Sequence, residues 1–263
     1  MKGIRAIIAL DMKRFFQEPM RLIPGLMQPL LYLFVLGSGL GSSMGKMPAG
    51  NDYRGFIFPG VITMSLLFTS TFAGISIVFD RQIGFFKAVL VAPVSRSAIA
   101  FGKVVAGALQ ALLQGMILLF VLPLVNLHPD LENVALLIPA MILASLTFSA
   151  MGVALASRFT STNVFPIVIN TVVLPMFFMS GAMYPLQPAP GWMQKLAHLD
   201  PVAYAVDLIR GALLGREHMF FSPWLAITVL SAVVVVLTWS AVRVFSRGEE
   251  VDLTGASKFP WRR

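Results

Sequence analysis

From Val104 to Leu127 the chain reads VVAGALQALLQGMILLFVLPLVNL, without a single Asp, Glu, Lys or Arg. A helix that crosses the hydrocarbon core of a bilayer needs about 20 consecutive, mostly apolar residues. This stretch meets that requirement in length and in composition. It therefore predicts a membrane-spanning helix, and with it the fold class of the whole chain.

Five other stretches have the same character. They are Leu22–Leu40, Gly55–Phe79, Val134–Ser157, Val164–Met183 and Pro223–Val242. The composition agrees with this, because 57% of the residues are hydrophobic and 12% are charged, whereas soluble domains average about 25% charged residues. We predict an all-α integral membrane protein with six transmembrane helices, which form a single domain over residues 1–263.

The basic residues indicate the orientation in the membrane. With the N-terminus in the cytoplasm, the inner segments carry fifteen of the twenty Lys and Arg residues and the outer segments carry five. Cytoplasmic loops are enriched in Lys and Arg, so we expect both termini in the cytoplasm. Topology accounts for the net charge of +8, and no nucleic-acid partner is expected. The first apolar stretch, Ala6–Leu10, is too short for the core of a secretory signal peptide.

Residues 1–18 predict an amphipathic helix ahead of the first span. Ile4, Ile7, Ile8 and Phe15 fall on one side of it. Asp11 falls near this apolar side and does not fit the pattern. Such a helix either lies on the membrane surface or also contacts a cytoplasmic partner.

Residues that carry enzyme chemistry are sparse. The chain has no cysteine and no G-x-x-x-x-G-K-[ST] loop, so it lacks that means of holding ATP. Its three histidines are scattered over the predicted outer segments, and no metal site is expected. Residues 41–45 match G-x-S-x-G by letter, but the nucleophile elbow needs a preceding strand, and here a predicted transmembrane helix precedes it.

The predicted spans hold neutral polar residues and no ionisable ones. Carriers driven by protons or sodium usually keep an ionisable group at depth, although carbonyls and hydroxyls alone can bind sodium. If this protein moves a molecule uphill, the energy is therefore expected to come from another chain.

The loop Phe79–Arg96 between the second and third spans reads FDRQIGFFKAVLVAPVSR. It is amphipathic and too charged to cross the membrane. Pro93 should interrupt any helix that begins at Asp80. The loop predicts either a helix on the membrane surface or a docking helix for a cytoplasmic protein.

The outer segment 184–222 predicts one short helix. Asp200 is a good N-cap and Pro201 suits the first helical turn. Tyr204, Asp207 and Arg210 follow at every third position, and the last two could pair on one face. The apolar part, 202–214, is too short to cross a bilayer, so we expect a re-entrant or interfacial helix.

Together these two segments resemble the ABC-2 family of ATP-binding-cassette transporter permeases. One family pattern, F-[ED]-R-x-x-G-x(5–6)-L-x-x-P-V-S-R, matches residues 79–96, with Asp80 where many members have Glu. The other, S-G-x-x-Y-P…P-x-W…[DN]-P-x-x-Y-x-x-D-x-x-R, matches residues 180–210. The resemblance extends to the length, the number of spans and the cytoplasmic termini.

The resemblance implies a second permease subunit, usually a homodimer, and two copies of a separate ATPase subunit. ATP and Mg would bind to that ATPase, and this chain would hold no cofactor. The ATPase would dock on the interface helix 1–18 and the coupling loop 80–97, through Asp80, Arg81, Gly84, Pro93 and Arg96. Paired short helices of the outer segment would re-enter the outer leaflet before the sixth span and close the exit, as a gate formed by Tyr184, Pro185, Pro190, Trp192, Asp200, Pro201, Tyr204, Asp207 and Arg210.

The implied function is outward transport across a bacterial cytoplasmic (inner) membrane, by a subunit that is not itself an enzyme. The expected cargo is an amphipathic, drug-like or lipid-linked molecule, taken from the cytoplasm or the inner leaflet. Two alternatives remain open. One is a passive channel or an ion-coupled secondary transporter. The other is a membrane-embedded enzyme that acts on lipids, for which the histidines and carboxylates offer no convergent catalytic groups.

Overall fold

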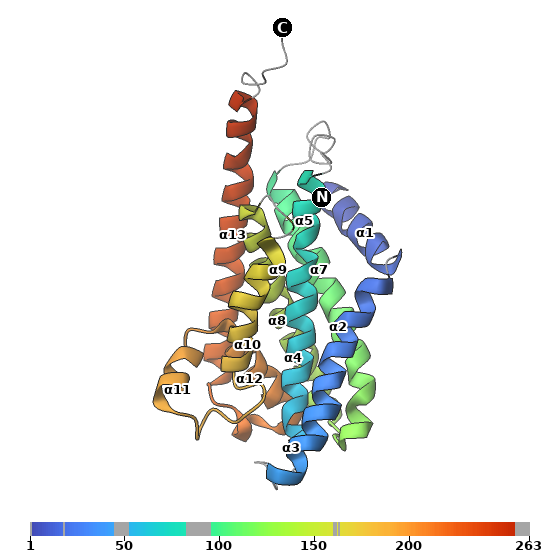
Figure 1. The fold of residues 1–263 in the computed structure, drawn as a ribbon, viewed down its shortest axis with the longest axis vertical. Helices are drawn as coiled ribbons and strands as arrows, with labels where there is room; N and C mark the ends of the chain where they lie inside the picture. Colours follow the sequence, from blue (N-terminus) through green and yellow to red (C-terminus); the bar gives the residue numbers. More distant parts are fainter. Residues whose placement is uncertain are drawn as a thin grey trace.

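A computed structural model describes residues 2–17, 19–44, 53–82, 96–159, 162 and 164–255. Over these ranges the chain is helical and contains no strand. Most of the helices run along the long axis of the molecule (Figure 1). The all-α class predicted from the sequence is confirmed, and the apolar helices agree with an integral membrane protein.

Four helical stretches are long and apolar enough to cross a bilayer. They are Tyr53–Asp80, Ser97–Val125, Leu131–Arg158 and Pro223–Val244. The helices that form them are α4 (Tyr53–Ala73) with α5 (Ile75–Gln82), α7 (Arg96–Leu118) with the 3-10 segment η2 (Leu119–Val125), α8 (Leu131–Arg158) and α13 (Pro223–Gly255). These stretches correspond to the second, third, fourth and sixth predicted spans.

The first and fifth predicted spans are shorter apolar stretches, Gly25–Gly41 and Pro166–Met179. The first runs through α2 (Pro19–Leu31), the π-helical turn η1 (Tyr32–Leu36) and α3 (Gly37–Met44). The second runs through α9 (Val164–Val168), the π-helical turn η3 (Ile169–Val173) and α10 (Leu174–Met179). Length alone therefore does not confirm the predicted number of six spans.

Pro29 lies in α2 and has no N–H to donate to the carbonyl of Gly25, four residues earlier. The hydroxyl of Ser65 in α4 donates to that carbonyl at 3.4 Å. A neighbouring helix thus satisfies the group that the proline leaves free, as proline in a membrane helix requires.

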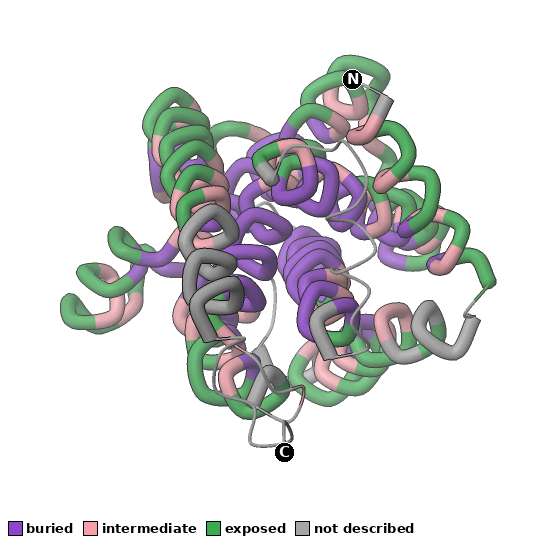
Figure 2. Tube along the Cα trace, turned by 90° about the horizontal axis from the view of Figure 1, so that it is seen from above, coloured by how far each residue is buried: buried purple, intermediate pink, exposed green. Residues whose placement is uncertain are grey.

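Helix α4 lies in the middle of the bundle and is buried over most of its length. It packs against α7, α8 and α12. Figure 2 shows the buried residues gathered in the centre and the exposed ones outside. Large apolar side chains such as Phe120, Val235 and Trp239 are exposed on the surface of the bundle, where a lipid environment can accommodate them.

Glycines let α4 and α8 approach closely. A Cβ atom at Gly152 would lie 2.7 Å from the Cα of Thr71, and one at Gly74 would lie 2.6 Å from the carbonyl oxygen of Gly152. The four-residue spacing of Gly152 and Ala156 is typical of closely packed helices, and the approach at Gly152 is of that kind.

The two ends of the bundle are built differently. At one end α1 (Lys2–Gln17) packs against α7, and α13 extends beyond the bundle at this same end (Figure 1). At the other end α11 (Gly191–Ala197) and α12 (Pro201–Leu214) lie close together, and α12 packs on α4, α8 and α13. The helix predicted over residues 1–18 and the short outer helix are both present.

Candidate functional site

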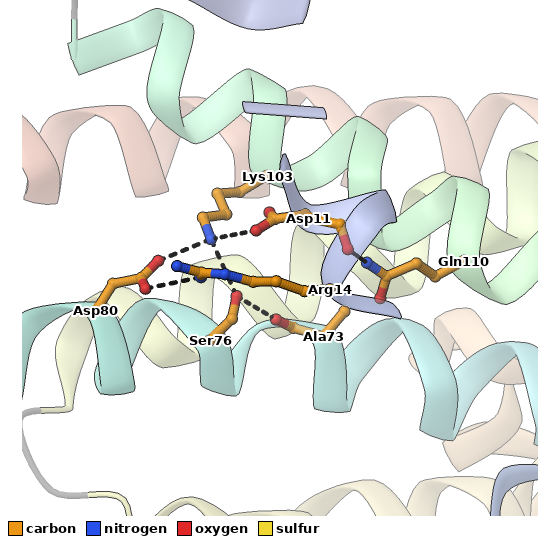
Figure 3. Close-up of polar contacts among 7 residues, drawn as sticks. All are labelled: Asp11, Arg14, Ala73, Ser76, Asp80, Lys103 and Gln110. Carbon is orange, nitrogen blue, oxygen red and sulfur yellow. Dashed lines mark hydrogen bonds and ion pairs between the residues drawn. The ribbon is translucent and has the colours of Figure 1, made fainter. Parts of the chain in front are cut away.

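A buried ammonium group joins three helices at the end where α1 lies. Nζ of Lys103 in α7 lies 3.0 Å from Oδ1 of Asp11 in α1 and 2.9 Å from Oδ2 of Asp80 in α5. It also donates to the hydroxyl of Ser76 at 3.2 Å. A lysine ammonium has three donors, and each of them has an acceptor here (Figure 3).

The two aspartates make further contacts, one through a carboxylate and one through the backbone. Oδ1 of Asp80 accepts a hydrogen bond of 3.0 Å from Nη1 of Arg14. The side-chain amide of Gln110 donates to the backbone carbonyl of Asp11 at 3.2 Å. We call Asp11, Arg14, Asp80 and Lys103 the inner charge cluster. It balances two positive charges against two negative ones (Figure 3).

Three of the four residues in the inner charge cluster are buried, and the side chain of Arg14 is 33% exposed. Lys103 is 7% exposed, Asp11 6% and Asp80 3%. Burying a charge costs several kcal/mol unless it is paired and hydrogen-bonded, and removing one partner of such a group costs about 3–5 kcal/mol. The cluster therefore fixes the three helices relative to one another.

The cluster lies at the base of the predicted coupling loop. Asp80 is in the last turn of α5 and Lys103 is near the start of α7, so the two residues lie on either side of the loop. Asp11 and Arg14 come from the interface helix. Ile7 of the same helix packs on Gly102, where an added Cβ would lie 3.2 Å from Cγ2 of Ile7. The interface helix is thus bound to both helices that flank the loop.

This arrangement corrects one inference from the sequence. The predicted spans seemed to hold no ionisable residue, but Asp80 and Lys103 lie within two of the candidate spans. The predicted boundaries, Phe79 and Val104, stopped one residue short of each. Asp11, the misfit on the apolar side of its helix, was the one signal in the sequence that pointed to the cluster, since a buried carboxylate needs a partner.

The structure describes only some of the other predicted coupling residues. Arg81 lies in the last turn of α5 and Arg96 is the first residue of α7. Gly84 and Pro93 lie outside the described residues. The role of all five residues in docking stays a prediction.

At the opposite end, α12 holds the outer segment together through three polar side chains. The hydroxyl of Tyr204 donates to the carbonyl of His198 at 2.9 Å, and its ring stacks on Phe221 with centroids 4.1 Å apart. The carboxylate of Asp207 accepts hydrogen bonds of 2.9 Å from the N–H of Phe220 and 2.7 Å from that of Phe221. These contacts join α12 to the turn after α11 and to the segment that enters α13.

Arg210 binds the turn that follows α10. Its Nη2 donates to the carbonyl of Gly181 at 2.7 Å, and its guanidinium lies 4.6 Å from the ring centroid of Phe56 in α4. Gly181 has a φ of +75°, in the left-handed region that favours glycine. The spacing of Asp207 and Arg210 allowed them to pair on one helix face, and they do interact electrostatically. The hydrogen bonds described above, however, go to the backbone of two different segments.

The start of α4 binds this same turn. The hydroxyl of Tyr53 donates to the carbonyl of Met183 at 3.0 Å. A Cβ atom at Gly60 would lie 2.4 Å from the carbonyl oxygen of Ala182, so only glycine allows this approach. We call residues 180–222 the outer cap, and α4 is part of its support.

The remaining predicted gate residues lie in the outer cap. Asp200 is the N-cap of α12, as predicted, and accepts from the N–H of Val202 at 2.8 Å, while Pro201 begins the helix. Tyr184 and Pro185 follow the turn at Gly181, Pro190 is the residue before α11, and Trp192 in α11 is 60% exposed. Their role as a gate stays a prediction.

Burial shifts the pKa of several groups in the outer cap, among them Asp200 and Arg210. It raises the pKa of Asp200 to about 7, against the opposing effect of the hydrogen bond from Val202. It lowers the pKa of Arg210 to about 10, and the nearby carboxylate of Asp207 limits this change. Arg210 therefore stays charged at neutral pH. Among the described residues, no group of three His, Cys, Asp or Glu side chains is arranged to hold a metal ion.

Comparison with known proteins agrees with this architecture. The family model for ABC-2 type transporters matches residues 2–214. Nodulation protein J of Neorhizobium galegae is 29% identical over 75% of this chain and 76% of its own length. Nodulation protein J of Rhizobium leguminosarum bv. viciae is 31% identical over 74% of this chain and 75% of its own. The putative transport permease ycf38 of Porphyra purpurea is 31% identical over 79% and 73%. The chain is thus a multi-pass transport permease that belongs to the ABC-2 type transporter family.

Proposed function

We propose that this chain is the membrane-spanning subunit of an exporter driven by a separate ATPase. The observation that carries the proposal is the inner charge cluster, which binds the interface helix to both helices that flank the coupling loop. A partner protein that pushes on the interface helix or on the coupling loop would therefore move both of them together, as one unit. In this proposal two permease copies pair with two ATPase subunits, and ATP and Mg bind on the ATPase.

A continuous path leads from that unit to the outer cap. The stretch Tyr53–Asp80 has 28 residues, which corresponds to roughly 42 Å of helix. At its inner end Asp80 belongs to the cluster. At its outer end Tyr53 and Phe56 contact the turn at Gly181 and the guanidinium of Arg210. A displacement at the inner end would therefore pass through α5 and the consecutive helix α4 to the outer cap, and release of the cap would open the exit.

A cavity beside the inner charge cluster supports an amphipathic cargo. It has a volume of about 400 Å³ and is lined by α1, α2, α4, α5 and α7, with four phenylalanine rings together with Gln28, Thr69 and Gln110. Ligand sites typically have volumes of 300–1,000 Å³ and a mostly apolar lining with a few polar groups. In our proposal the cargo is drug-like or lipid-linked and enters here from the cytoplasm or the inner leaflet of the inner membrane.

The proposal is tested by purifying the tagged chain in mild detergent and identifying the proteins that remain bound by mass spectrometry. We expect a stoichiometric partner with a phosphate loop, and its ATPase activity should respond to the presence of this chain. A chain that purifies alone, under conditions where a known transporter complex stays intact, would contradict the proposal.

One observation favours an ion-coupled carrier as the second candidate function. Asp11 and Asp80 are buried carboxylates close to a cavity, as in proton relays. Their oxygens are already engaged by Lys103 and Arg14, which speaks against that role. Flux into liposomes that contain the chain alone, driven by a pH gradient without ATP, would support the carrier.

A further inference from the structure

A second cavity lies between α8, α12 and α13, at the end of the molecule that carries the outer cap (Figure 1). Its volume is about 340 Å³. The lining is almost entirely apolar, with Leu136 and Leu143 from α8, Leu208 and Ala212 from α12, and Ile227 from α13. Gly211 from α12 also lines it, and Met219 packs closely on Gly211, where an added Cβ would lie 2.4 Å from its sulfur.

Arg216 and Trp224 give the cavity a polar rim. Arg216, in the 3-10 turn η4 (Arg216–His218), lines the cavity and is exposed. The neighbouring carboxylate of Glu217 lies 3.4 Å from Nδ1 of His218. Trp224, in the first turn of α13, also lines the cavity and is 80% exposed. Tryptophan is enriched where a membrane helix meets the headgroup region.

The surface around the cavity is apolar where it continues along α13. Leu225 is 45% exposed, Val235 67% and Trp239 54%. Since Pro223–Val244 is a candidate span, this face meets the hydrocarbon of the bilayer. The cavity therefore lies near the start of a candidate membrane-spanning helix, with an apolar interior and a cation at the rim.

We propose that this cavity binds one anionic phospholipid from the leaflet on the outer-cap side. An acyl chain lies among the side chains of α8, α12 and α13, and the phosphate lies at the guanidinium of Arg216. Basic pockets between transmembrane helices bind anionic headgroups in this way, and a guanidinium matches the geometry of a phosphate. The lipid packs against α12 and so against the helix that holds the outer cap. This site does not depend on the ATP-driven mechanism.

The experiment uses the fluorescence of Trp224. Replacing Trp192, Trp239 and Trp261 with Phe leaves Trp224 as the single tryptophan in the chain. The protein is reconstituted into phosphatidylcholine vesicles that contain a small fraction of lipid brominated near the top of its acyl chain. One series contains brominated phosphatidylglycerol and the other brominated phosphatidylcholine. Bromine quenches a tryptophan that it contacts, so the quenching reports which lipid occupies the cavity.

We expect phosphatidylglycerol to occupy the site with a preference of about fivefold over phosphatidylcholine. Arg216→Gln should abolish this preference, and Lys195→Gln, which removes an exposed cation elsewhere in the outer cap, should leave it intact. Ala212→Leu should reduce quenching by both lipids because it fills the cavity. Equal quenching by the two lipids in the unmodified site would overturn the proposal, as would a preference that survives Arg216→Gln. A tryptophan shielded from both lipids would show that a protein surface, such as a second copy, covers the cavity.

Discussion

At the scale of single residues, the structure explains why α12 carries a polar residue at every third position. The sequence shows this spacing but not the contacts that the side chains make. Tyr204, Asp207 and Arg210 each satisfy the backbone of a different segment, at His198, at Phe220 and Phe221, and at Gly181. Buried backbone groups in irregular segments need partners, and each of these side chains supplies one. The three residues therefore determine how the segments on either side of α12 are held.

In this region, features that depend on neighbouring residues could be predicted from the sequence. Contacts between residues far apart in the chain could not. The N-cap at Asp200 and the helix start at Pro201 follow from residues next to each other in the chain. The partner of Asp207 lies 13 or 14 residues away, across a turn. No spacing rule connects them, because the turn between them is set by its packing and not by a periodic pattern.

Asp200 leads to a prediction about pH. Its pKa is raised from 3.8 to about 7 in the folded protein, so its contribution to stability is fully present below pH 4 and is lost as the pH rises through 7. The cost at high pH is at most about 4 kcal/mol. Asp200→Asn keeps the N-cap, since Asn caps as well as Asp, and removes the titration. Thermal unfolding in detergent should therefore depend less on pH between 5 and 8 in the variant, with a higher Tm than the parent at pH 8.

Asp130→Asn is the matched control, because Asp130 is also the N-cap residue of a helix, α8, but is exposed. It should leave the pH profile unchanged. A profile that is the same for the parent and for Asp200→Asn would show that Asp200 is charged throughout this range.

At the scale of elements, α1 shows how a membrane-surface helix is turned into a fixed part of the bundle. The apolar pattern of residues 1–18 predicts a helix that lies on the membrane. Asp11 breaks that pattern because its side chain faces Lys103 and not lipid. The sequence marks Asp11 as exceptional, but its partner is 92 residues away, and only the packing of α1 against α7 brings the two together.

The double variant Asp11→Leu with Lys103→Met tests whether this contact transmits motion. It removes one charge of each sign, and it leaves the pair of Arg14 and Asp80 in place. Apolar residues of similar size often replace buried ion pairs without loss of stability. We therefore expect normal folding and retained ATP hydrolysis by the assembled complex, with transport reduced about tenfold or more because α1 is released from α7.

Lys13→Met is the control in the same helix, since Lys13 is exposed. It should transport normally. Lys103→Arg should keep part of the transport, because a guanidinium can still reach carboxylate oxygens. Full transport by the double variant, at normal expression and ATPase activity, would assign the cluster to stability alone.

The predicted spans also differ in how much of their structure could be predicted from the sequence. Uniform apolar length predicted α4, α8 and the start of α13 at Pro223 closely, but it began the third span at Val104, whereas α7 begins at Arg96. It could not show that the first and fifth stretches contain π-helical turns at Tyr32–Leu36 and Ile169–Val173. Such turns depend on which carbonyls the neighbouring helices satisfy, and hydropathy carries no information about that.

At the scale of the whole molecule, the inner charge cluster and the outer cap lie at opposite ends, with α4 between them (Figure 1). The helix that begins at Lys2 and the far end of α13 are both at the end with the cluster. This agrees with the even number of crossings that the distribution of Lys and Arg predicts.

The orientation itself can be measured with introduced cysteines, because the chain has none of its own. Arg5→Cys in α1 and Lys195→Cys in α11 place one thiol at each end, and both positions are exposed. A membrane-impermeant maleimide should label Lys195→Cys in intact spheroplasts. It should reach Arg5→Cys only after the membrane is made permeable. The reverse pattern would show that the cluster faces away from the cytoplasm.

The residues of the inner charge cluster are far apart in the sequence, so they leave the ribosome at different times during synthesis. Asp11 leaves the ribosome 92 residues before Lys103, an interval of roughly 5–20 s at ordinary rates of synthesis. Until then Asp11 lacks its buried partner, and the first helix has to remain in contact with water at the membrane surface. It can dock only once the beginning of α7 has emerged from the ribosome. The inner face of the permease is therefore completed late in biogenesis, although its first residues are the first to be made.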